Sequence, residues 1–239
     1  MASEDPRLAY VVALDGTAGS GKSSTARAVA ARLGWRHLDS GAFYRALAWA
    51  LRRHRGGLDD LASLCETDLD ALGLEALPAP TGFRLRLAGA DLDEAELRSS
   101  DVTACVSDVA AQPVVRRWLL PRFRRLRAYG PLVAEGRDMG TVVFPDATLK
   151  VFLVADPDQR ARRRLLERGE PLTPERLAAE RAALEDRDRR DASRADAPLR
   201  AADDARWLDT SHLSFEEQVE RIVAWVQERL DIDNTVGRG

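Results

Sequence analysis

The sequence predicts a single α/β domain, residues 1–239, in which a parallel β-sheet is covered by helices on both faces. Short apolar runs alternate along the chain with helical patterns, and this alternation is typical of parallel sheets. A glycine-rich loop joins the first apolar run to the first helical pattern. The length of 239 residues, 45% of them hydrophobic, suffices for one domain with a sizeable core, whereas two unrelated domains would each be small.

The elements follow from the apolar runs and from the turn residues that separate them. The expected strands are residues 10–14, 36–39, 132–134, 149–155 and, more weakly, 206–209. The expected helices are residues 23–33, 42–51 and 214–230. The first strand ends at Asp15-Gly16, where the glycine-rich loop begins.

Two segments depart from this alternation. Residues 58–98 combine an acidic stretch, a turn-rich stretch at 77–82 and an alternating stretch at 83–87. This pattern predicts a helix and a small hairpin inserted between strands of the main sheet. Residues 159–194 are dense in charge of both signs, and glycine and prolines between 169 and 174 divide them into two helical stretches. Such a segment is typical of a solvated helical face and also fits a mobile cover.

Composition excludes several functional classes. The formal net charge of -3 argues against a protein that coats nucleic-acid polymers or anionic membranes. Two cysteines and three scattered histidines provide neither a disulfide framework nor the spacing of a zinc site. The N-terminal segment lacks the basic region of a signal peptide, and no apolar stretch approaches the roughly eighteen residues of a membrane span. We therefore expect a cytoplasmic protein without a nucleic-acid or membrane partner.

Residues 16–23, Gly-Thr-Ala-Gly-Ser-Gly-Lys-Ser, satisfy the phosphate-loop pattern G-x-x-x-x-G-K-[ST]. The glycines let backbone N–H groups turn toward phosphate oxygens, and the following helix adds its partial positive charge. Lys22 would reach the β- and γ-phosphates, and the Ser23 hydroxyl would contact Mg²⁺. An ordinary glycine-rich turn is the alternative, and the position between a strand and a helix disfavours it. The residues expected to contact ATP here are Gly16, Thr17, Ala18, Gly19, Ser20, Gly21, Lys22, Ser23 and Ser24.

A phosphate loop does not by itself say how the nucleotide is used. A switch GTPase would read guanine with an Asn-Lys-x-Asp segment, yet Asn234 near the C-terminus is the only asparagine of the chain. A kinase is therefore the favoured interpretation. Lys22 and Lys150 are the only lysines among the 36 lysines and arginines, so the chain is rich in arginine throughout. Clusters of arginines are therefore weak evidence about the acceptor of this kinase.

Three further motifs suggest the acceptor. Residues 38–45 read Leu-Asp-Ser-Gly-Ala-Phe-Tyr-Arg, and they bring a hydroxyl, a phenol and a guanidinium together at a helix start. Residues 134–146 read Ala-Glu-Gly-Arg-Asp-Met-Gly-Thr-Val-Val-Phe-Pro-Asp, and residues 187–199 contain Arg-Asp-Arg-Arg-Asp-Ala-Ser-Arg followed by Ala-Pro-Leu. With the phosphate loop, these motifs resemble bacterial cytidylate kinase in the correct order over about residues 10–228.

The resemblance implies a P-loop NTPase fold of the nucleoside monophosphate kinase type, with a five-stranded parallel core. Within the single domain it implies a CMP-binding region with an insert at 40–100 and an arginine-rich lid at 158–181. The residues that it places around the acceptor phosphate are Ser40, Tyr44, Arg45, Arg137 and Arg194. Those that it places at the cytosine are Ser107, Arg116 and Asp138, and those at the sugar are Arg187 and Asp191.

In the expected lid, Arg163 and then Arg160 are the best choices for contacts with the ATP phosphates. A basic helix face with no such role is the alternative. The catalytic residues would be Lys22, Arg137 and Arg163. Glu135 departs from the family, which commonly has Asp at this position, and it could hold a Mg²⁺-bound water beside Ser23.

We therefore expect a monomeric kinase that transfers the γ-phosphoryl group of ATP to CMP, and also to dCMP, with Mg²⁺. Such a transfer requires positioning and charge neutralisation more than covalent chemistry. One alternative is another small-molecule kinase of the same fold, acting on UMP, AMP or an alcohol such as shikimate. A second is a non-catalytic module that binds ATP without releasing ADP.

Overall fold

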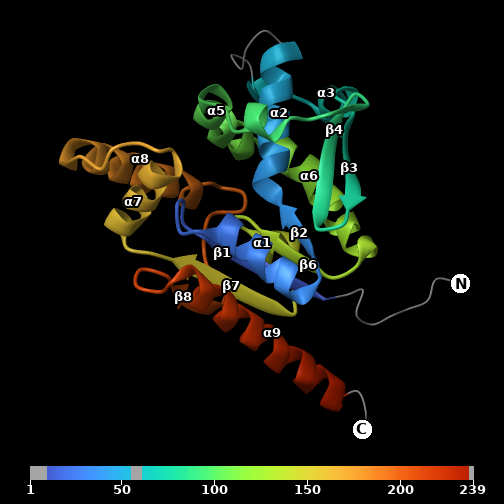
Figure 1. Ribbon diagram of the computed structural model, residues 1–239. Coiled ribbons are helices and arrows are strands. Elements are labelled where there is room, and N and C mark those ends of the chain that lie inside the picture. Colours follow the sequence, from blue (N-terminus) through green and yellow to red (C-terminus); the bar gives the residue numbers. More distant parts are fainter. Residues whose placement is uncertain (1–9, 55–60, 237–239) are drawn as a thin grey trace, which may run out of the picture.

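The computed structural model describes residues 10–54 and 61–236, and it confirms the predicted parallel sheet (Figure 1). Its five strands are β1 (Val11–Gly16), β2 (Arg36–Asp39), β6 (Leu132–Glu135), β7 (Leu149–Val154) and β8 (Arg206–Asp209). They lie in the order β2-β6-β1-β7-β8, and every neighbouring pair is parallel. In the described part of the chain, no helix is both long enough and apolar enough to cross a bilayer.

The side chains of β1 alternate between two helical layers. Val12 and Leu14 pack with helices α1 (Lys22–Leu33) and α9 (Phe215–Val236). Val11 and Ala13 face the other layer, which contains α2 (Ser40–His54) and α6 (Pro113–Leu126). All four side chains are fully buried. Burial on both faces is the reason that this strand reads in the sequence as a continuous apolar run.

The inserted segment contains the expected helix and hairpin. Helix α3 (Glu66–Ala71) precedes an antiparallel sheet of β3 (Leu74–Ala79), β4 (Gly82–Leu87) and β5 (Ala90–Asp91), and α4 (Glu94–Leu97) follows it. A short 3-10 helix (Leu61–Ser63) precedes α3, and residues 58–60 of the expected insert lie outside the described residues. The hairpin packs against β2, because the carbonyl of Thr81 accepts from the N–H of His37 at 3.1 Å.

Two helices follow the insert, in a region where the sequence analysis assigned no element. These are α5 (Ser100–Ala111) and α6, and a 3-10 turn (Arg127–Tyr129) leads from α6 into β6. Helix α6 contains Pro121 and many arginines, which obscure its apolar stripe. Its buried residues nevertheless recur at helical spacing, with Val115, Trp118 and Leu119 on the inner face.

The charge-rich segment forms two helices, as predicted. Helix α7 (Pro157–Glu167) is capped by Asp156, whose carboxylate accepts from two backbone N–H groups, and α8 (Pro174–Ala192) is capped by Thr173. The two helices lie side by side beyond the carboxyl end of β7 (Figure 1). The π-helical turn Met139–Val143, which follows β6, lies near the same end of β1.

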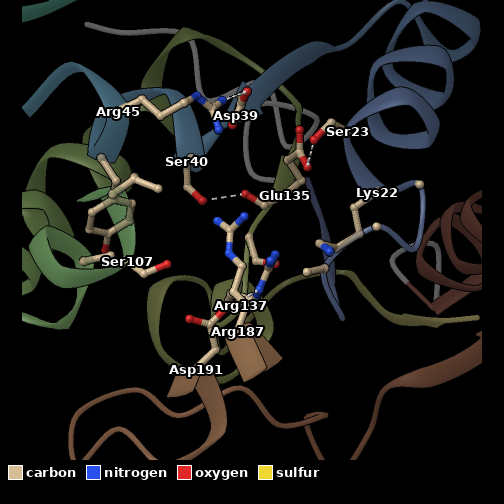
Figure 2. A pocket seen from close by; sticks show the side chains of 18 of the residues that line it. Lys22, Ser23, Asp39, Ser40, Arg45, Ser107, Glu135, Arg137, Arg187 and Asp191 are labelled. Atoms are coloured by element: carbon tan, nitrogen blue, oxygen red, sulfur yellow. Dashed lines mark hydrogen bonds and ion pairs between the residues drawn. The ribbon is translucent and has the colours of Figure 1, made fainter. Parts of the chain in front are cut away.

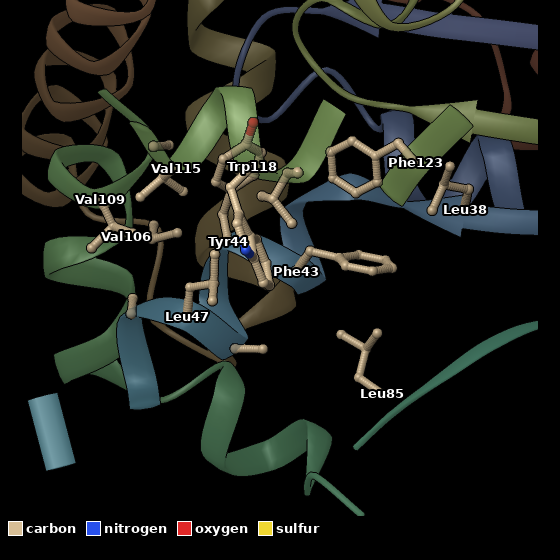
Figure 3. Close-up of a cluster of buried hydrophobic side chains, with 14 of the residues drawn as sticks. Leu38, Phe43, Tyr44, Leu47, Leu85, Val106, Val109, Val115, Trp118 and Phe123 are labelled. Atoms are coloured by element: carbon tan, nitrogen blue, oxygen red, sulfur yellow. The ribbon is translucent and has the colours of Figure 1, made fainter. Parts of the chain in front are cut away.

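Aromatic side chains fill the core under α2, as Figure 3 shows. The rings of Phe43 and Phe123 meet edge to face with centroids 4.9 Å apart. Tyr44, the next residue on α2, also contacts the Phe123 ring edge to face. Edge-to-face pairs of this kind add to the stabilisation from buried area. Because Tyr44 also lines the cavity described below, this core holds one wall of the functional site.

We predict that Phe123→Ala lowers the free energy of unfolding by about 3–5 kcal/mol, because it leaves a cavity among side chains that cannot close over it. Chemical denaturation followed by circular dichroism measures this loss. The matched control is Phe215→Ala, since the Phe215 side chain is 48% exposed, and we expect it to change stability by less than about 1 kcal/mol. Equal losses in the two variants would contradict the assignment of Phe123 to the core.

Candidate active site

A cavity of about 700 Å³ lies at the carboxyl ends of β1, β2 and β6, between the phosphate loop, α2, α5, α7 and α8. Figure 2 shows charged side chains around it, among them Lys22, Arg45, Glu135, Arg137 and Arg187. In an open parallel sheet this is the edge at which ligands bind. Most of the site residues predicted from the sequence line the cavity: Ala18, Gly19, Gly21, Lys22, Ser23, Ser24, Ser40, Tyr44, Arg45, Ser107, Glu135, Arg137, Asp138, Arg163, Arg187, Asp191 and Arg194.

The phosphate loop connects β1 directly to the N-terminus of α1. Gly19 and Gly21 adopt positive φ angles of 72° and 89°, which glycine accepts without strain. Within residues 10–54 and 61–236, no side chain caps the N-terminus of α1, and the first turn of this helix contains no acidic residue. The backbone N–H groups of this turn are therefore available to an anion, and the helix dipole favours one.

Lys22 lies buried at the base of this loop. Its Nζ donates to the carbonyl of Thr17 at 2.5 Å and lies 3.4 Å from the Ser20 hydroxyl. Burial lowers the pKa of Lys22 well below its ordinary value, and the nearby Arg137 guanidinium lowers that pKa further. A buried cation beside another cation gains stability from a bound anion, which indicates a site for phosphate at this point.

Ser23 and Glu135 form the oxygen-rich part of the cavity. The Ser23 hydroxyl donates to Glu135 Oε2 at 2.7 Å, and His37 Nε2 lies 3.1 Å from the other carboxylate oxygen, Oε1. The Ser40 hydroxyl donates to the Glu135 carbonyl at 2.7 Å. Hydroxyl and carboxylate oxygens are the ligands that Mg²⁺ prefers. The donor set at Ser23 and Glu135 thus fits a magnesium ion that also contacts phosphate oxygens.

Three arginines gather around one carboxylate on α8. Asp191 accepts from Arg137 Nε at 2.9 Å and is also hydrogen-bonded to Arg194. Arg187, one turn earlier, has a buried Nε that finds no hydrogen-bond partner among the described residues. Burial lowers the pKa of Arg187 to about 10, and the charge of Arg137 contributes to this shift. The positive charges outnumber the single carboxylate, so the cluster can take up an anion.

A second arginine position lies across the cavity on α2. Arg45 Nη2 donates to Asp39 Oδ2 at 2.8 Å, and about a sixth of each of these two side chains is exposed. Figure 2 shows this pair on the side of the cavity opposite Arg137 and Arg187. The cavity is thus bordered by guanidinium groups on two sides.

Asp138 and Arg116 form a buried ion pair at one end of the cavity. Arg116 also donates to the carbonyl of Ala110 at 3.2 Å, and its guanidinium lies over the Tyr44 ring at 5.7 Å. Burial raises the pKa of Asp138, and Arg116 opposes this shift. Asp138 and Ser107 face the cavity whereas Arg116 does not line it. A carboxylate and a hydroxyl there can read the polar edge of a ligand.

The arginines of α7 occupy different positions. Arg163 lines the cavity and donates to the Thr210 hydroxyl at 3.0 Å, whereas Arg160 is buried away from the cavity. Arg160 donates to the carbonyl of Ala18 at 3.0 Å and pairs with Asp188. The placement of Arg160 therefore does not support the predicted contact with ATP phosphates. Gly16, Thr17 and Ser20 likewise lie in the phosphate loop without lining the cavity.

The chain is similar to known proteins over most of its length. Residues 12–228 match the family model described as cytidylate kinase. The chain belongs to the cytidylate kinase family. A cytidylate kinase from Stutzerimonas stutzeri is 45% identical over 224 residues, which are 92% of this chain and 96% of that protein. The resemblance found in the motifs is confirmed.

Some members of the cytidylate kinase family are longer. A bifunctional pantoate ligase/cytidylate kinase from Prochlorococcus marinus is 47% identical over 217 residues, which are 89% of this chain and 44% of that protein. The chain thus spans less than half the length of these bifunctional relatives. A solved structure of an uncharacterized protein from Eubacterium ventriosum covers 92% of this chain with a TM-score of 0.51 and 13% identity, and this likeness shows the fold alone.

Sequence reasoning missed several charged residues of this cytidylate kinase family site. Asp39, Arg98 and Arg164 line the cavity, and Asp39 stands inside the quoted Leu-Asp-Ser-Gly motif. Asp15, the last residue before the phosphate loop, accepts from the N–H groups of Met139 and Gly140 at 2.8 and 2.7 Å. An acidic residue at the end of an otherwise apolar strand was the available signal for Asp15.

We predict that Asp15 makes the stability of the protein depend on pH. Burial, followed by the nearby charge of Asp138, raises the pKa of Asp15 from 3.8 to about 7, although the two N–H donors oppose the shift. Between about pH 4 and 7 the folded protein therefore holds a proton that the unfolded chain has lost, and stability falls as the pH rises through this window. Asp15→Asn should remove up to about 4 kcal/mol of this pH dependence.

Denaturation curves measured between pH 4.5 and 8 for wild type and Asp15→Asn test this prediction. The control is Asp203→Asn, an exposed carboxylate whose replacement should leave the pH dependence of the wild type in place. If the wild type and Asp15→Asn lose stability in parallel across this range, Asp15 is ionised throughout and the prediction is wrong.

Proposed function

We propose that the chain transfers the γ-phosphoryl group of ATP to a phosphate oxygen of CMP, and also of dCMP. The observation that carries this proposal is the single cavity that joins the phosphate loop and Lys22 to the arginine cluster and the buried Asp138. One end of this cavity suits a donor triphosphate, the middle an acceptor phosphate and the far end a polar base. Cytoplasmic location and the monomeric state remain predictions from the sequence.

Lys22 and the free N–H groups at the start of α1 would bind the β- and γ-phosphates of ATP. Mg²⁺ would be held by Ser23 and, through water, by Glu135, and when bound it would neutralise charge on the donor phosphates. Arg163 at the cavity wall would approach the transferring group. The described donor set supports these roles, because the buried positive charge of Lys22 faces the cavity without a carboxylate hydrogen-bonded to it.

The acceptor phosphate would lie between Arg45 on one side and Arg137 with Arg194 on the other. An oxygen of this phosphate attacks the γ-phosphorus, a new P–O bond forms, and the bond between that phosphorus and the oxygen bridging to the β-phosphate breaks, which releases ADP. Fixed guanidinium groups contribute by holding the two reactants in line, so little reorganisation is required at the transition state.

The base would be read at Asp138 and Ser107, with Arg116 fixing the Asp138 carboxylate. Cytosine presents an amino donor at N4 beside acceptors at N3 and O2, so a carboxylate suits one end of its edge and a hydroxyl donor the other. Uracil would place an acceptor against Asp138, which is repulsive. Arg187 and Asp191 would contact the sugar. Residues 40–100 would form the CMP-binding region, and residues 158–181 would form a lid that excludes water.

An ADP-release assay with CMP, dCMP, UMP, AMP and shikimate tests this function. We expect CMP and dCMP to be the preferred acceptors, with Lys22→Ala reducing kcat at least about a hundredfold because it removes a charge that stabilises the transferring group. The control is Arg32→Ala, an exposed residue on the same helix paired with Glu216. Preference for AMP or shikimate would support another small-molecule kinase, and ADP release with none of the acceptors would support a non-catalytic module.

The base-reading role of Asp138 gives a specificity prediction. Asp138→Asn keeps the size of the side chain and an oxygen for Arg116, but it removes the charge-assisted bond to cytosine N4 and the repulsion toward uracil O4. The ratio of kcat/KM for CMP over UMP should fall about tenfold or more, or roughly 1.4 kcal/mol. Asp108→Asn, exposed beside Ser107, is the control. A parallel decline with both nucleotides would show that the base is read elsewhere.

A further inference from the structure

Helices α7 and α8 hold the phosphate loop by the backbone of one residue. Asp188 Oδ1 on α8 accepts from the N–H of Ala18 at 2.8 Å. Arg160 Nη1 on α7 donates to the carbonyl of the same Ala18 at 3.0 Å. The guanidinium and the carboxylate are also paired with each other. Both backbone polar groups of Ala18 are therefore bound by one ion pair that spans two helices.

This ion pair lies mostly out of solvent. The Arg160 side chain is 6% exposed and the Asp188 side chain 15% exposed. Apolar contacts surround the same point, because Ala18, Ala161 and Leu184 form a small buried cluster. Gly19 is closely packed as well, since a Cβ there would lie 3.3 Å from Arg160 Cβ. Arg160 could reach the cavity only by leaving both Ala18 and Asp188.

The pairing resolves an electrostatic difficulty at an anion site. A lone carboxylate beside the phosphate loop would repel the phosphates that the loop binds. With Arg160 bound to it, Asp188 orients the Ala18 peptide while the pair adds no net charge. The N–H of Ala18 is directed toward α8, and Gly19, Gly21 and Lys22 remain along the cavity.

Helix α8 also reaches the acceptor side of the cavity. Asp191 lies three residues after Asp188, and thus one helical turn away. It binds Arg137 and Arg194, whereas Asp188 binds the phosphate loop. One helix therefore contacts both the phosphate loop at one end of the cavity and the arginine cluster next to it.

We propose that Arg160 and Asp188 are positioning residues that fix the phosphate loop, so that α8 sets its alignment with the acceptor arginines. This assigns Arg160 a role different from the direct phosphate contact that the sequence suggests. The proposal rests on the proposed function only in requiring that the loop binds the donor phosphates. It is independent of which acceptor is used.

The experiment compares Arg160→Met, Asp188→Asn and the double variant with wild type. Calorimetry with inorganic tripolyphosphate and Mg²⁺ measures binding at the loop without any acceptor, and steady-state assays give kcat and KM for ATP and CMP. Exchange of the Ala18 N–H with deuterium, followed by NMR, reports on the bond to Asp188. Arg162→Met and Asp186→Asn are the controls, because both residues lie on the same helices and neither contacts the loop.

We expect each single variant to weaken tripolyphosphate binding about tenfold, with kcat lowered and the dissociation constant for CMP changed less than twofold. The double variant should be no worse than the singles, because either change already breaks the pair. Ala18 should exchange faster in each. Arg160→Lys, which keeps the charge and one donor, should retain part of the affinity even if Arg160→Met fails to fold.

Direct phosphate binding by Arg160 gives different results. Asp188→Asn would then tighten tripolyphosphate binding by removing a negative charge, while Arg160→Met would weaken it, and the two effects would add. Tighter tripolyphosphate binding in Asp188→Asn, additive effects in the double variant, or unchanged exchange of the Ala18 N–H in Asp188→Asn would each overturn the proposal. Absence of CMP phosphorylation in the wild type would instead contradict the proposed function and leave the tripolyphosphate result to be judged separately.

Discussion

The pairing of β1 with β6 is the constraint on which the site depends. These two strands run in parallel with Leu14 opposite Glu135, although 121 positions separate the two residues in the sequence. Because parallel strands end at the same edge, the phosphate loop after β1 and the Gly-Arg-Asp segment after β6 begin side by side. Two hydrogen bonds, from the N–H groups of Met139 and Gly140 to the Asp15 carboxylate, hold the two segments together just beyond the strands.

Charge balance explains why so many arginines can occupy one cavity. Guanidinium groups that line the cavity are paired with carboxylates: Arg45 with Asp39, and Arg137 and Arg194 with Asp191. Behind the lining, Arg116 pairs with Asp138 and Arg160 with Asp188. Such pairs fix the direction of each guanidinium while leaving part of its donor capacity unused. Lys22 and Arg187 have no carboxylate of this kind hydrogen-bonded to them in the described residues, and burial depresses the pKa of both. A bound anion in the cavity would therefore stabilise the charged forms of both groups.

The sequence predicted those parts of the molecule that depend on local pattern. The central strands β1, β6 and β7 were found because they are largely apolar and buried on both faces, and the phosphate loop because its glycines and Lys22 have a fixed spacing. Strand order could not be obtained this way, since β6 lies between β1 and β2 without any signal in its own residues. The resemblance identified most cavity residues, but in an arginine-rich chain it could not separate Arg160, bound to the loop backbone, from Arg163, which faces the cavity. That distinction depends on burial and on partners distant in sequence.

Glu135 illustrates how a departure from the family pattern is accommodated. Its side chain is one methylene longer than the Asp that the family commonly has, and an unsupported carboxylate of that length would have more rotamers to populate. In this chain the Glu135 carboxylate is held on both oxygens, by the Ser23 hydroxyl on one side and by His37 on the other. His37 belongs to β2, so the partner strand that supplies the Ser40 motif also supplies the second contact. The longer side chain thus reaches the Ser23 hydroxyl, which is expected at the metal, and also contacts the neighbouring strand through His37. The backbone carbonyl of Glu135 accepts from the Ser40 hydroxyl. The Glu135 carboxylate oxygen stays beside Ser23 because His37, on the neighbouring strand, provides a second anchor for the side chain.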